Sequence, residues 1–365
     1  MNTSRSTPSI TPDHVGSDWF DWRWQLRHAL RSAAELDTIL DLTPGERRAL
    51  RHPAGLPFRL TPYYFGLINR DDPKDPLRRM VIPLPAEQEV LPGERQDPLG
   101  EEERTRVPGL VHRYPDRVLL LAAGECPVYC RYCTRGRIVG QRDAPRPNRR
   151  RWQDAVDYIA DHTEVHDVLI SGGDPLILGD AKLEWLVAAL RDIPHIDIIR
   201  IGSKVPFVLP MRITPDLCRR LQPCQPLYFS LHVNHPNEIT AAACDACELL
   251  ADHGFVLGSQ TVLLQGINDD ADTLRRLFRE LLCIRVRPYY LLQCDPITGS
   301  GHFRVPVDRG LEIMRQLRGT ISGYGIPQYI LDIPGGAGKV PLSPDYIDGR
   351  TSKDLLLRDI HGNSG

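Results

Sequence analysis

The sequence lacks an apolar run long enough for a membrane-spanning helix, because its longest candidates, such as residues 118–123, are only as long as a strand. No apolar segment follows the polar N-terminal residues, so we expect no signal peptide and a cytoplasmic protein without a membrane partner. Neither sign of charge is in excess: 45 Lys and Arg residues stand against 47 Asp and Glu residues, a net charge of −2. This balance argues against a general nucleic-acid binder.

The cysteines do not form the even set of a disulfide framework. There are nine, none of them after Cys294, in a chain of 365 residues without a predicted signal. Such a chain is expected to use its thiols as metal ligands or to bury them. With 41% hydrophobic and 25% charged residues it can build a large core, and 32 prolines predict many stiff loops.

Four regions can be separated along the chain. We expect a disordered tail in residues 1–16, a mainly helical and irregular region in 17–110 that wraps a larger body, an α/β body in 111–340, and a short C-terminal tail in 341–365. Within the second region a helix is predicted near 18–31, and Thr43 with Glu46 forms the pattern of a capping box.

The α/β body alternates short apolar runs with helical patterns. The runs lie at 118–123, 168–171, 198–202, 227–233, 256–263, 286–293 and 328–332. The helical patterns between them lie at 152–160, 183–190, 215–221, 238–250, 273–282 and 310–317. This alternation predicts a parallel sheet. Six repeats and a last strand are too few for a closed eightfold barrel, so we expect a partial (βα)6 barrel, open on one side, with ligands at the C-terminal ends of its strands.

Three cysteines stand directly after the first strand of this body. Cys126, Cys130 and Cys133 form a CxxxCxxC motif, and their thiolates can hold three irons of a cubane cluster. The fourth iron then lacks a protein ligand, and an open metal position is typical of a reactive site. A zinc site or a chance group of buried thiols would be the alternatives, and the position after the first barrel strand disfavours both.

This motif resembles the signature of the radical S-adenosylmethionine enzymes, in which the open iron binds the amine and carboxylate of S-adenosylmethionine. A second motif, SGGDP at 171–175, follows the second strand. It matches the Gly-Gly-acid motif that binds the methionine amine in that superfamily, with Gly172 and Gly173 allowing close backbone approach and Asp174 offering a carboxylate. An ordinary turn would have the same sequence.

A glycine-rich loop near the C-terminus carries Lys339. The loop is no Walker A motif, because Ile333 and Val340 occupy positions that require Gly and Ser or Thr. A lysine on such a loop at a strand end can form a Schiff base with pyridoxal phosphate, although a solvated loop lysine would look the same.

The chain as a whole resembles the lysine 2,3-aminomutase family, which combines an iron–sulfur cluster, S-adenosylmethionine and pyridoxal phosphate. The resemblance runs from about residue 18 to residue 345. Besides the cysteine and Lys339 loops, it rests on DWRWQ (21–25), LTPYY (60–64), PGLVHRYPDR (108–117), LHVNHPNE (231–238), PYY (288–290), QCD (293–295) and HFR (302–304).

The resemblance assigns one set of residues to pyridoxal phosphate and the amino acid. Lys339 would form the Schiff base, and Arg113, Tyr114 and Arg117 would hold the cofactor, since arginines suit its phosphate. Arg135 would bind the substrate carboxylate. The two carboxylates that would receive the distal ammonium are Asp295 and Asp332.

A second set is assigned to S-adenosylmethionine. His232 and Gln260 match positions near this cofactor, and Tyr132, which replaces a histidine usual in the family, can stack beside the adenine. Longer family members bind zinc through cysteines in a C-terminal tail together with a cysteine of another subunit. Here no cysteine follows Cys294, and Asp270 stands at the other position, so we expect no structural zinc and an altered subunit contact in any homo-oligomer.

The resemblance implies an isomerase that converts L-lysine to β-lysine. A carbon radical would abstract the β hydrogen, and the migrating nitrogen, held as an imine, would offer a π bond on which the radical closes. A flavodoxin- or ferredoxin-type protein would supply the electron. The alternatives are the same reaction on arginine or glutamate, β-lysine supply for modification of elongation factor P, or, in a different class, a non-catalytic iron–sulfur carrier or sensor. Electron transfer alone would need neither Lys339 nor Arg135.

Overall fold

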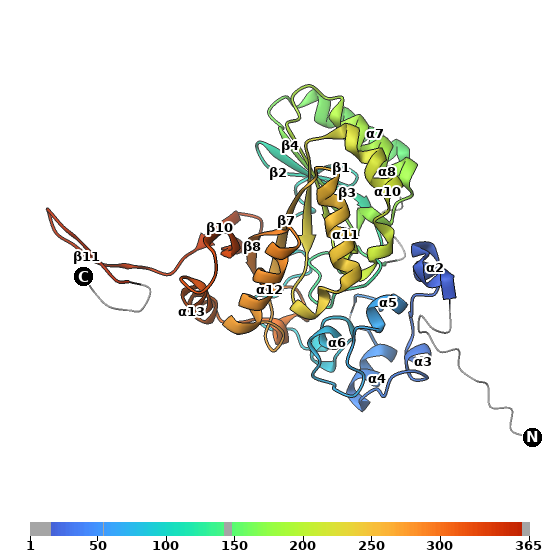
Figure 1. Cartoon of the computed structure of the whole chain (residues 1–365), viewed down its shortest axis with the longest axis horizontal. Coiled ribbons are helices and arrows are strands. Elements are labelled where there is room, and N and C mark those ends of the chain that lie inside the picture. Colours follow the sequence, from blue (N-terminus) through green and yellow to red (C-terminus); the bar gives the residue numbers. More distant parts are fainter. Residues whose placement is uncertain (1–15, 54, 142–147, 360–365) are drawn as a thin grey trace, which may run out of the picture.

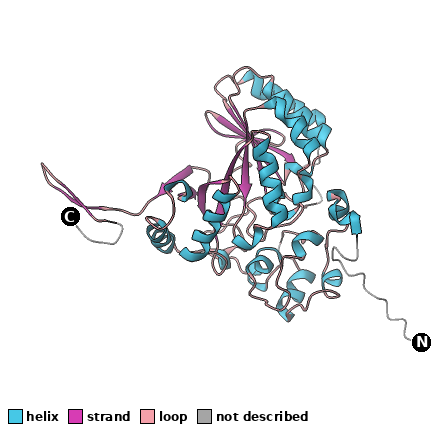
Figure 2. Cartoon of the chain, viewed as in Figure 1, coloured by secondary structure: helices cyan, strands magenta, loops and turns pink. Residues whose placement is uncertain are grey.

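A computed structural model describes residues 16–53, 55–141 and 148–359, so the tail predicted for residues 1–16 falls, apart from Gly16, outside the described residues. The centre of the molecule is a β-sheet flanked by helices (Figure 2). It has ten strands, which follow in chain order from β1 to β10. Its seven parallel strands are β3 (Arg117–Ala123), β4 (Asp167–Gly172), β5 (Ile198–Ser203), β6 (Leu227–His232), β7 (Val256–Leu263), β8 (Arg287–Gln293) and β9 (Gln328–Ile333).

A helix follows each of the first six parallel strands (Figure 1). The six are α7 (Arg149–Asp161), α8 (Asp180–Arg191), α10 (Pro215–Leu221), α11 (Ala241–Asp252), α12 (Ala271–Cys283) and α13 (Val307–Leu317). Helix α12 shows why they pack on the sheet: Leu274, Leu277, Phe278 and Leu281 recur at helical spacing and are fully buried. The predicted partial barrel is therefore confirmed.

Two antiparallel additions extend the sheet beyond the predicted strands. At one edge, β1 (Thr105–Val107) pairs with β2 (Leu110–Tyr114), which pairs with β3. At the other edge, β10 (Gly338–Leu342) pairs with β9 and brings Lys339 opposite Asp332. Among the described strands these two edges do not pair with each other, so the barrel is open.

The N-terminal region consists of short helices. They are η1 (Gly16–Phe20), α2 (Trp22–Arg27), α3 (Ala33–Leu36), α4 (Pro44–Arg51), α5 (Pro62–Phe65), α6 (Pro76–Val81) and η2 (Pro85–Gln88). The single helix predicted near 18–31 is wrong in extent, because Asp21 interrupts it and caps α2 by accepting from the Arg23 amide. The predicted capping box of Thr43 and Glu46 is confirmed at the start of α4.

Short elements occupy the connections. They are η3 (Pro175–Ile177), α9 (Val205–Val208), η4 (Pro210–Arg212), η5 (Gln222–Cys224), η6 (Pro236–Glu238), η7 (Gly301–Phe303) and η8 (Gly323–Gly325). Near the C-terminus, β11 (Ile347–Arg350) and β12 (Leu355–Leu357) form a separate hairpin, the C-terminal arm, which projects away from the body (Figure 1). No helix in the described ranges is long and apolar enough to span a membrane.

The end of β4 lies directly against the start of the cysteine loop. The amide of Gly173 donates to the Ala123 carbonyl at 2.6 Å, and the amide of Asp174 donates to the Glu125 carbonyl at 2.8 Å. A Cβ atom on Gly173 would lie 2.1 Å from the Glu125 oxygen, which is well inside van der Waals contact. Only glycine therefore lets the two strand ends approach this closely.

We predict that Gly173→Ala destabilises the fold by about 1–3 kcal/mol, because the methyl group must push backbone rather than a flexible side chain. The same displacement should move the cysteine loop and lower the iron content after reconstitution. Denaturant unfolding and iron analysis measure the two effects. Gly323→Ala is the control, since a Cβ there meets nothing within 4 Å. Equal stability and iron content in both variants would contradict this account of the contact.

Candidate functional site

The cysteine loop is held in place by the N-terminal region. The amide of Tyr129 donates to the Arg59 carbonyl at 3.0 Å, and the amide of Arg131 donates to the Met80 carbonyl at 2.9 Å. The buried Arg131 side chain also forms an ion pair with Glu87. These contacts explain why the irregular N-terminal residues are needed: they fix the backbone between the three cysteines.

The three thiols lie close enough together to influence one another. Burial and the neighbouring Cys130 raise the pKa of Cys133 to about 11, and burial also raises the pKa values of Cys126 and Cys130. The ammonium of Lys204 counteracts the rise at Cys130. In the described part of the chain, no group of three His, Cys, Asp or Glu side chains could hold one metal ion. A cubane differs from a single ion because each thiolate binds its own iron, so three separate thiols in one loop fit it.

Asp174 is anchored beneath this loop. Its carboxylate accepts from the Ser203 hydroxyl and the Lys204 amide, both at 2.8 Å, and burial raises its pKa to about 6. Gly172 approaches the backbone of Ala123 at the end of β3, and Gly173 approaches that of Glu125 at the start of the cysteine loop. Contact of this motif with a bound methionine amine stays a prediction.

The residues predicted near S-adenosylmethionine, with Tyr132 beside its adenine, are neighbours. The Tyr132 hydroxyl lies 3.1 Å from Nε2 of His232 and accepts from Asn234 at 2.7 Å. Across strands β6 and β7, His232 is the direct partner of Gln260. Burial, with a smaller effect from Lys204, lowers the pKa of His232 to about 3, so this imidazole is neutral at physiological pH.

The predicted pyridoxal phosphate residues come together at the open side of the barrel. Asp332 forms ion pairs with both Lys339 and Arg113. The Lys339 amide donates to the Tyr114 hydroxyl at 3.0 Å. The guanidinium carbons of Arg113 and Arg117 lie 5.1 Å and 4.9 Å from the Tyr114 ring centroid. The lysine and the basic residues that would take a phosphate therefore form one cluster.

The two carboxylates at this cluster, Asp295 and Asp332, have pKa values shifted in opposite directions. Burial raises the pKa of Asp295 to about 7, and the negative charge of Asp332 adds to the rise. Burial would also raise the pKa of Asp332, but its hydrogen-bonded pairs with Arg113 and Lys339 lower it. Among the described residues Asp295 forms no ion pair, and Lys339 with Arg113 only partly offsets the rise in its pKa, so it is a group that a substrate ammonium could stabilise.

Arg135 follows Cys133 by two residues and is bound to a carboxylate that the sequence did not single out. Its Nε donates to both oxygens of Glu101 at 3.1 Å, and its Nη2 donates to Oε1 at 2.7 Å. Glu101 is only 4% exposed. No sequence signal distinguishes Glu101, because it lies in a stretch of charged residues. The buried ion pair of Lys204 and Glu238 has no spacing signal either, although Glu238 ends one of the motifs of the resemblance.

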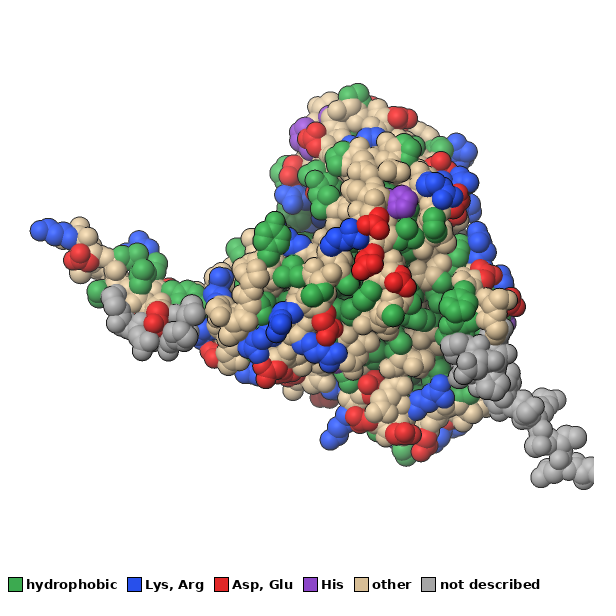
Figure 3. Space-filling view, viewed as in Figure 1, with side chains coloured by type: hydrophobic (Ala, Val, Ile, Leu, Met, Phe, Trp, Pro, Cys, Tyr) green, Lys and Arg blue, Asp and Glu red, His purple; other side chains and the backbone are tan. Residues whose placement is uncertain are grey.

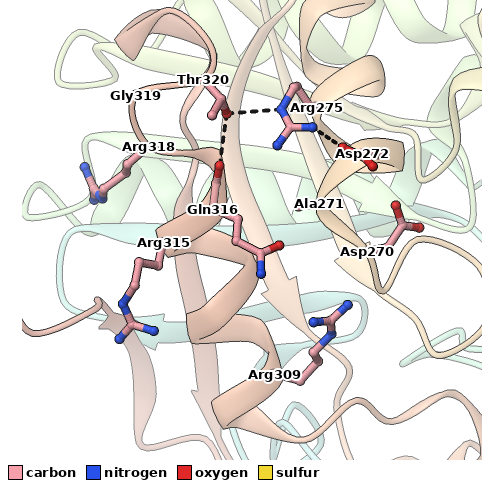
Figure 4. Close-up of a pocket in the computed structure, with 10 residues that line it drawn as sticks. All are labelled: Asp270, Ala271, Asp272, Arg275, Arg309, Arg315, Gln316, Arg318, Gly319 and Thr320. Carbon is pink, nitrogen blue, oxygen red and sulfur yellow. Dashed lines mark hydrogen bonds and ion pairs between the residues drawn. The ribbon is translucent and has the colours of Figure 1, made fainter. Parts of the chain in front are cut away.

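A separate hollow of about 590 Å³ lies between α12 and α13 (Figure 4). Arginines dominate its lining, namely Arg275, Arg309, Arg315 and Arg318. Arg275 pairs with Asp272, and Arg315 pairs with Glu312. None of the predicted site residues lines this hollow, so it is separate from the cysteine loop and from the cluster around Lys339.

The pKa of Asp295 gives a testable pH dependence. An aspartate raised from 3.8 to about 7 on folding binds a proton more tightly in the folded state, so stability falls as pH rises between those values. We predict that Asp295→Asn removes this fall. In substrate-free protein the variant should gain stability relative to wild type between pH 5 and pH 8, measured by denaturant unfolding. Asp154→Asn changes an exposed aspartate and is the control, for which no such gain is expected. If the difference in unfolding free energy between Asp295→Asn and wild type did not change with pH, the raised pKa of Asp295 would be contradicted.

The comparisons with known proteins agree with this arrangement. A family model described as the radical SAM superfamily matches residues 122–277, and one described as lysine-2,3-aminomutase matches residues 314–364. The chain is 46% identical over 351 residues to L-lysine 2,3-aminomutase of Clostridium subterminale, covering 96% of this chain and 84% of the relative. It is 46% identical over 363 residues to the enzyme of that name from Fusobacterium nucleatum, covering 99% and 85%.

A relative with a different printed substrate is also similar. Glutamate 2,3-aminomutase of Clostridioides difficile is 42% identical over 351 residues, covering 94% of this chain and 82% of the relative. All three alignments extend through the cysteine loop, the barrel and the Lys339 loop, because each covers nearly the whole chain. The protein belongs to the lysine 2,3-aminomutase family of radical S-adenosylmethionine enzymes.

Proposed function

We propose that the protein is an L-lysine 2,3-aminomutase, an isomerase that moves the α-amino group of lysine to the β carbon. As a member of this family, the enzyme uses a [4Fe–4S] cluster, S-adenosylmethionine and pyridoxal phosphate and acts on a small amino acid. The observation that carries the choice of lysine is the pair of carboxylates, Asp295 and Asp332, beside Lys339.

The residues of the chain suit the three cofactors. Cys126, Cys130 and Cys133 would hold the cluster, and Lys339 would hold pyridoxal phosphate, with Arg113, Tyr114 and Arg117 around it. His232, Gln260, Tyr132 and the Gly172–Asp174 turn would receive S-adenosylmethionine. When bound, these groups supply hydrogen-atom abstraction from the β carbon and a π system that carries the migrating nitrogen.

The protein itself would align the amino acid from its two ends. Arg135 would bind the carboxylate, and Asp295 with Asp332 would bind the distal ammonium. Such a two-ended grip fixes which carbon faces the cluster side, and orientation of this kind is a large part of enzymatic rate enhancement. The buried Tyr132 and Phe303 rings, 5.9 Å apart, help to exclude water beside the cysteine loop.

Charge distinguishes lysine from the other candidate substrates. Glutamate would bring a third carboxylate next to Asp295, whose pKa is already raised to about 7 by burial and by the charge of Asp332. Arginine would present a guanidinium and satisfies the charge requirement. Lysine is preferred over arginine because relatives named L-lysine 2,3-aminomutase are 46% identical to this chain.

We predict that reconstituted wild-type enzyme converts lysine faster than arginine and does not convert glutamate at a comparable rate. Asp295→Asn should lower kcat/KM for lysine on the order of 100- to 1000-fold, because a buried substrate charge loses its partner. Iron and pyridoxal content should stay at wild-type levels. Product analysis by chromatography measures turnover, with Asp154→Asn as the exposed control. Faster turnover of glutamate than of lysine would overturn the proposal.

We further infer a cytoplasmic enzyme with a flavodoxin- or ferredoxin-type reductant and a homo-oligomeric assembly. All nine cysteines are free thiols, which suits a reducing compartment. The C-terminal arm supports an assembly: Leu355, Leu356 and Leu357 are 48%, 47% and 46% exposed on a two-stranded sheet. Figure 3 shows hydrophobic side chains on the surface of this arm. A hairpin of this kind is marginal in water unless its apolar side chains pack against another surface.

We predict that the double variant Leu355→Ser with Leu357→Ser lowers the molecular mass in solution, because it removes apolar surface that a second copy would cover. Light scattering after size-exclusion chromatography measures the mass. Val90→Ser changes an exposed apolar residue on the body and is the control. Wild-type mass should survive washing with a chelator, since no zinc is expected at the contact. Unchanged mass in the double variant would refute the role of the arm.

A further inference from the structure

Glu101 lies near both the cysteine loop and the charged residues around Asp295. Its carboxylate binds Arg135, and its Oε2 also lies 3.5 Å from Nη2 of Arg137. Its negative charge contributes to the raised pKa values of Cys133 and Asp295, whose main cause is burial. One buried carboxylate is therefore close to the cysteine loop on one side and to the amino-acid cluster on the other.

The segment that carries Glu101 is attached to both flanking loops. The Arg95 amide donates to the Pro296 carbonyl at 2.9 Å, next to Asp295, and the Thr298 amide donates back to the Arg95 carbonyl at 3.1 Å. The Gly335 amide donates to the Pro98 carbonyl at 2.8 Å, within the loop that leads to Lys339. Backbone hydrogen bonds at these two points fix the segment, so Glu101 is anchored relative to Asp295 and Lys339.

The geometry of the pair leaves part of Arg135 free. A guanidinium can bind one carboxylate through its Nε–Nη2 edge and another through its Nη1–Nη2 edge. Glu101 uses the Nε–Nη2 edge. Within the described residues, Nη1 of Arg135 has no hydrogen-bond partner. The side chain is 18% exposed and is therefore not completely enclosed by the described residues.

We propose that Glu101 is a positioning residue for substrate recognition: it fixes Arg135 by one edge so that the other edge is presented to the α-carboxylate of the amino acid. This role rests on the proposed function, in which Arg135 binds that carboxylate. Without Glu101, the long arginine side chain would lose its fixed orientation and would have to be ordered again by each substrate molecule.

The test compares two ligands that differ only in the carboxylate. L-lysine and 1,5-diaminopentane share the carbon chain and both amines, and calorimetry can measure their binding to cluster- and pyridoxal-reconstituted enzyme without S-adenosylmethionine. Glu101→Ala should weaken lysine binding roughly tenfold or more, the effect of losing an ion-assisted hydrogen bond, and leave diaminopentane binding within about twofold. Glu101→Gln keeps one acceptor oxygen and should lie in between.

Two controls separate positioning from damage to the fold. Glu102→Gln removes the charge of a neighbouring glutamate whose side chain is 72% exposed and pairs with Arg137, and this variant should bind both ligands as wild type does. In an Arg135→Gln background, the further change Glu101→Ala should cost little additional lysine affinity, because the group it positions is already gone. Equal weakening of both ligands, or full additivity of the two changes, would overturn the proposal.

Three other results would distinguish failure of the Glu101 role from failure of the proposed function. Tighter lysine binding by Glu101→Ala would show that Glu101 competes with the substrate for Arg135 and would refute its positioning role. If wild type binds lysine more tightly than diaminopentane and Glu101→Ala keeps the same ratio of affinities, only the role of Glu101 is refuted. Wild-type enzyme that binds the two ligands equally would contradict the proposed function and this role together.

Discussion

The carboxylate of Asp332 joins the two edges of the open barrel. It pairs with Arg113 from β2 at one edge and with Lys339 from β10 at the other, although the described strands at these edges do not pair with each other. A buried ion pair adds little net stability, but removing one partner leaves a buried charge unpaired, which costs roughly 3–5 kcal/mol. Side-chain ion pairs thus connect the two sides of the open barrel beside the predicted amino-acid site.

The charge of Asp332 affects the neighbouring carboxyl group of Asp295. Asp332 is paired with two cations, whereas Asp295 forms no ion pair among the described residues, and its pKa rises to about 7 through burial and repulsion by Asp332. The substrate-free site therefore contains an unbalanced carboxyl group that a lysine ammonium would neutralise. In the same cluster of charged groups, Glu101 holds one edge of Arg135. Lysine would bring an ammonium to Asp295 and a carboxylate to the other edge of Arg135.

Much of the barrel could be predicted because its signal is local. The run at 256–263 coincides with β7, and the pattern at 215–221 coincides with α10. Strands β2 and β10 were missed because they are short and carry polar residues, glycine or proline, so that only pairing with β3 and β9 makes them strands. The helix predicted near 18–31 failed because Asp21 prefers to cap.

The candidate site divides along similar lines. The spacing of Cys126, Cys130 and Cys133 pointed to a cluster by itself, since three thiolates in one loop have few other uses. The roles of Arg113, Arg135, Asp295 and Asp332 came from the resemblance, because single charged residues on different strands carry no spacing signal. Glu101 and Lys204 were found only in three dimensions, where residues far apart in sequence become partners.

The assignment of Lys339 as the pyridoxal phosphate lysine can be tested directly. The chain has five lysines, and the buried Lys204, beside the cysteine loop, is the alternative that chemistry would allow. Borohydride reduction of enzyme reconstituted with cluster and pyridoxal phosphate, followed by mass-spectrometric peptide mapping, identifies the modified residue. The account predicts a pyridoxyl group on Lys339 and an unmodified Lys204 in enzyme with a full complement of iron. A pyridoxyl group on Lys204, with Lys339 unmodified, would contradict it.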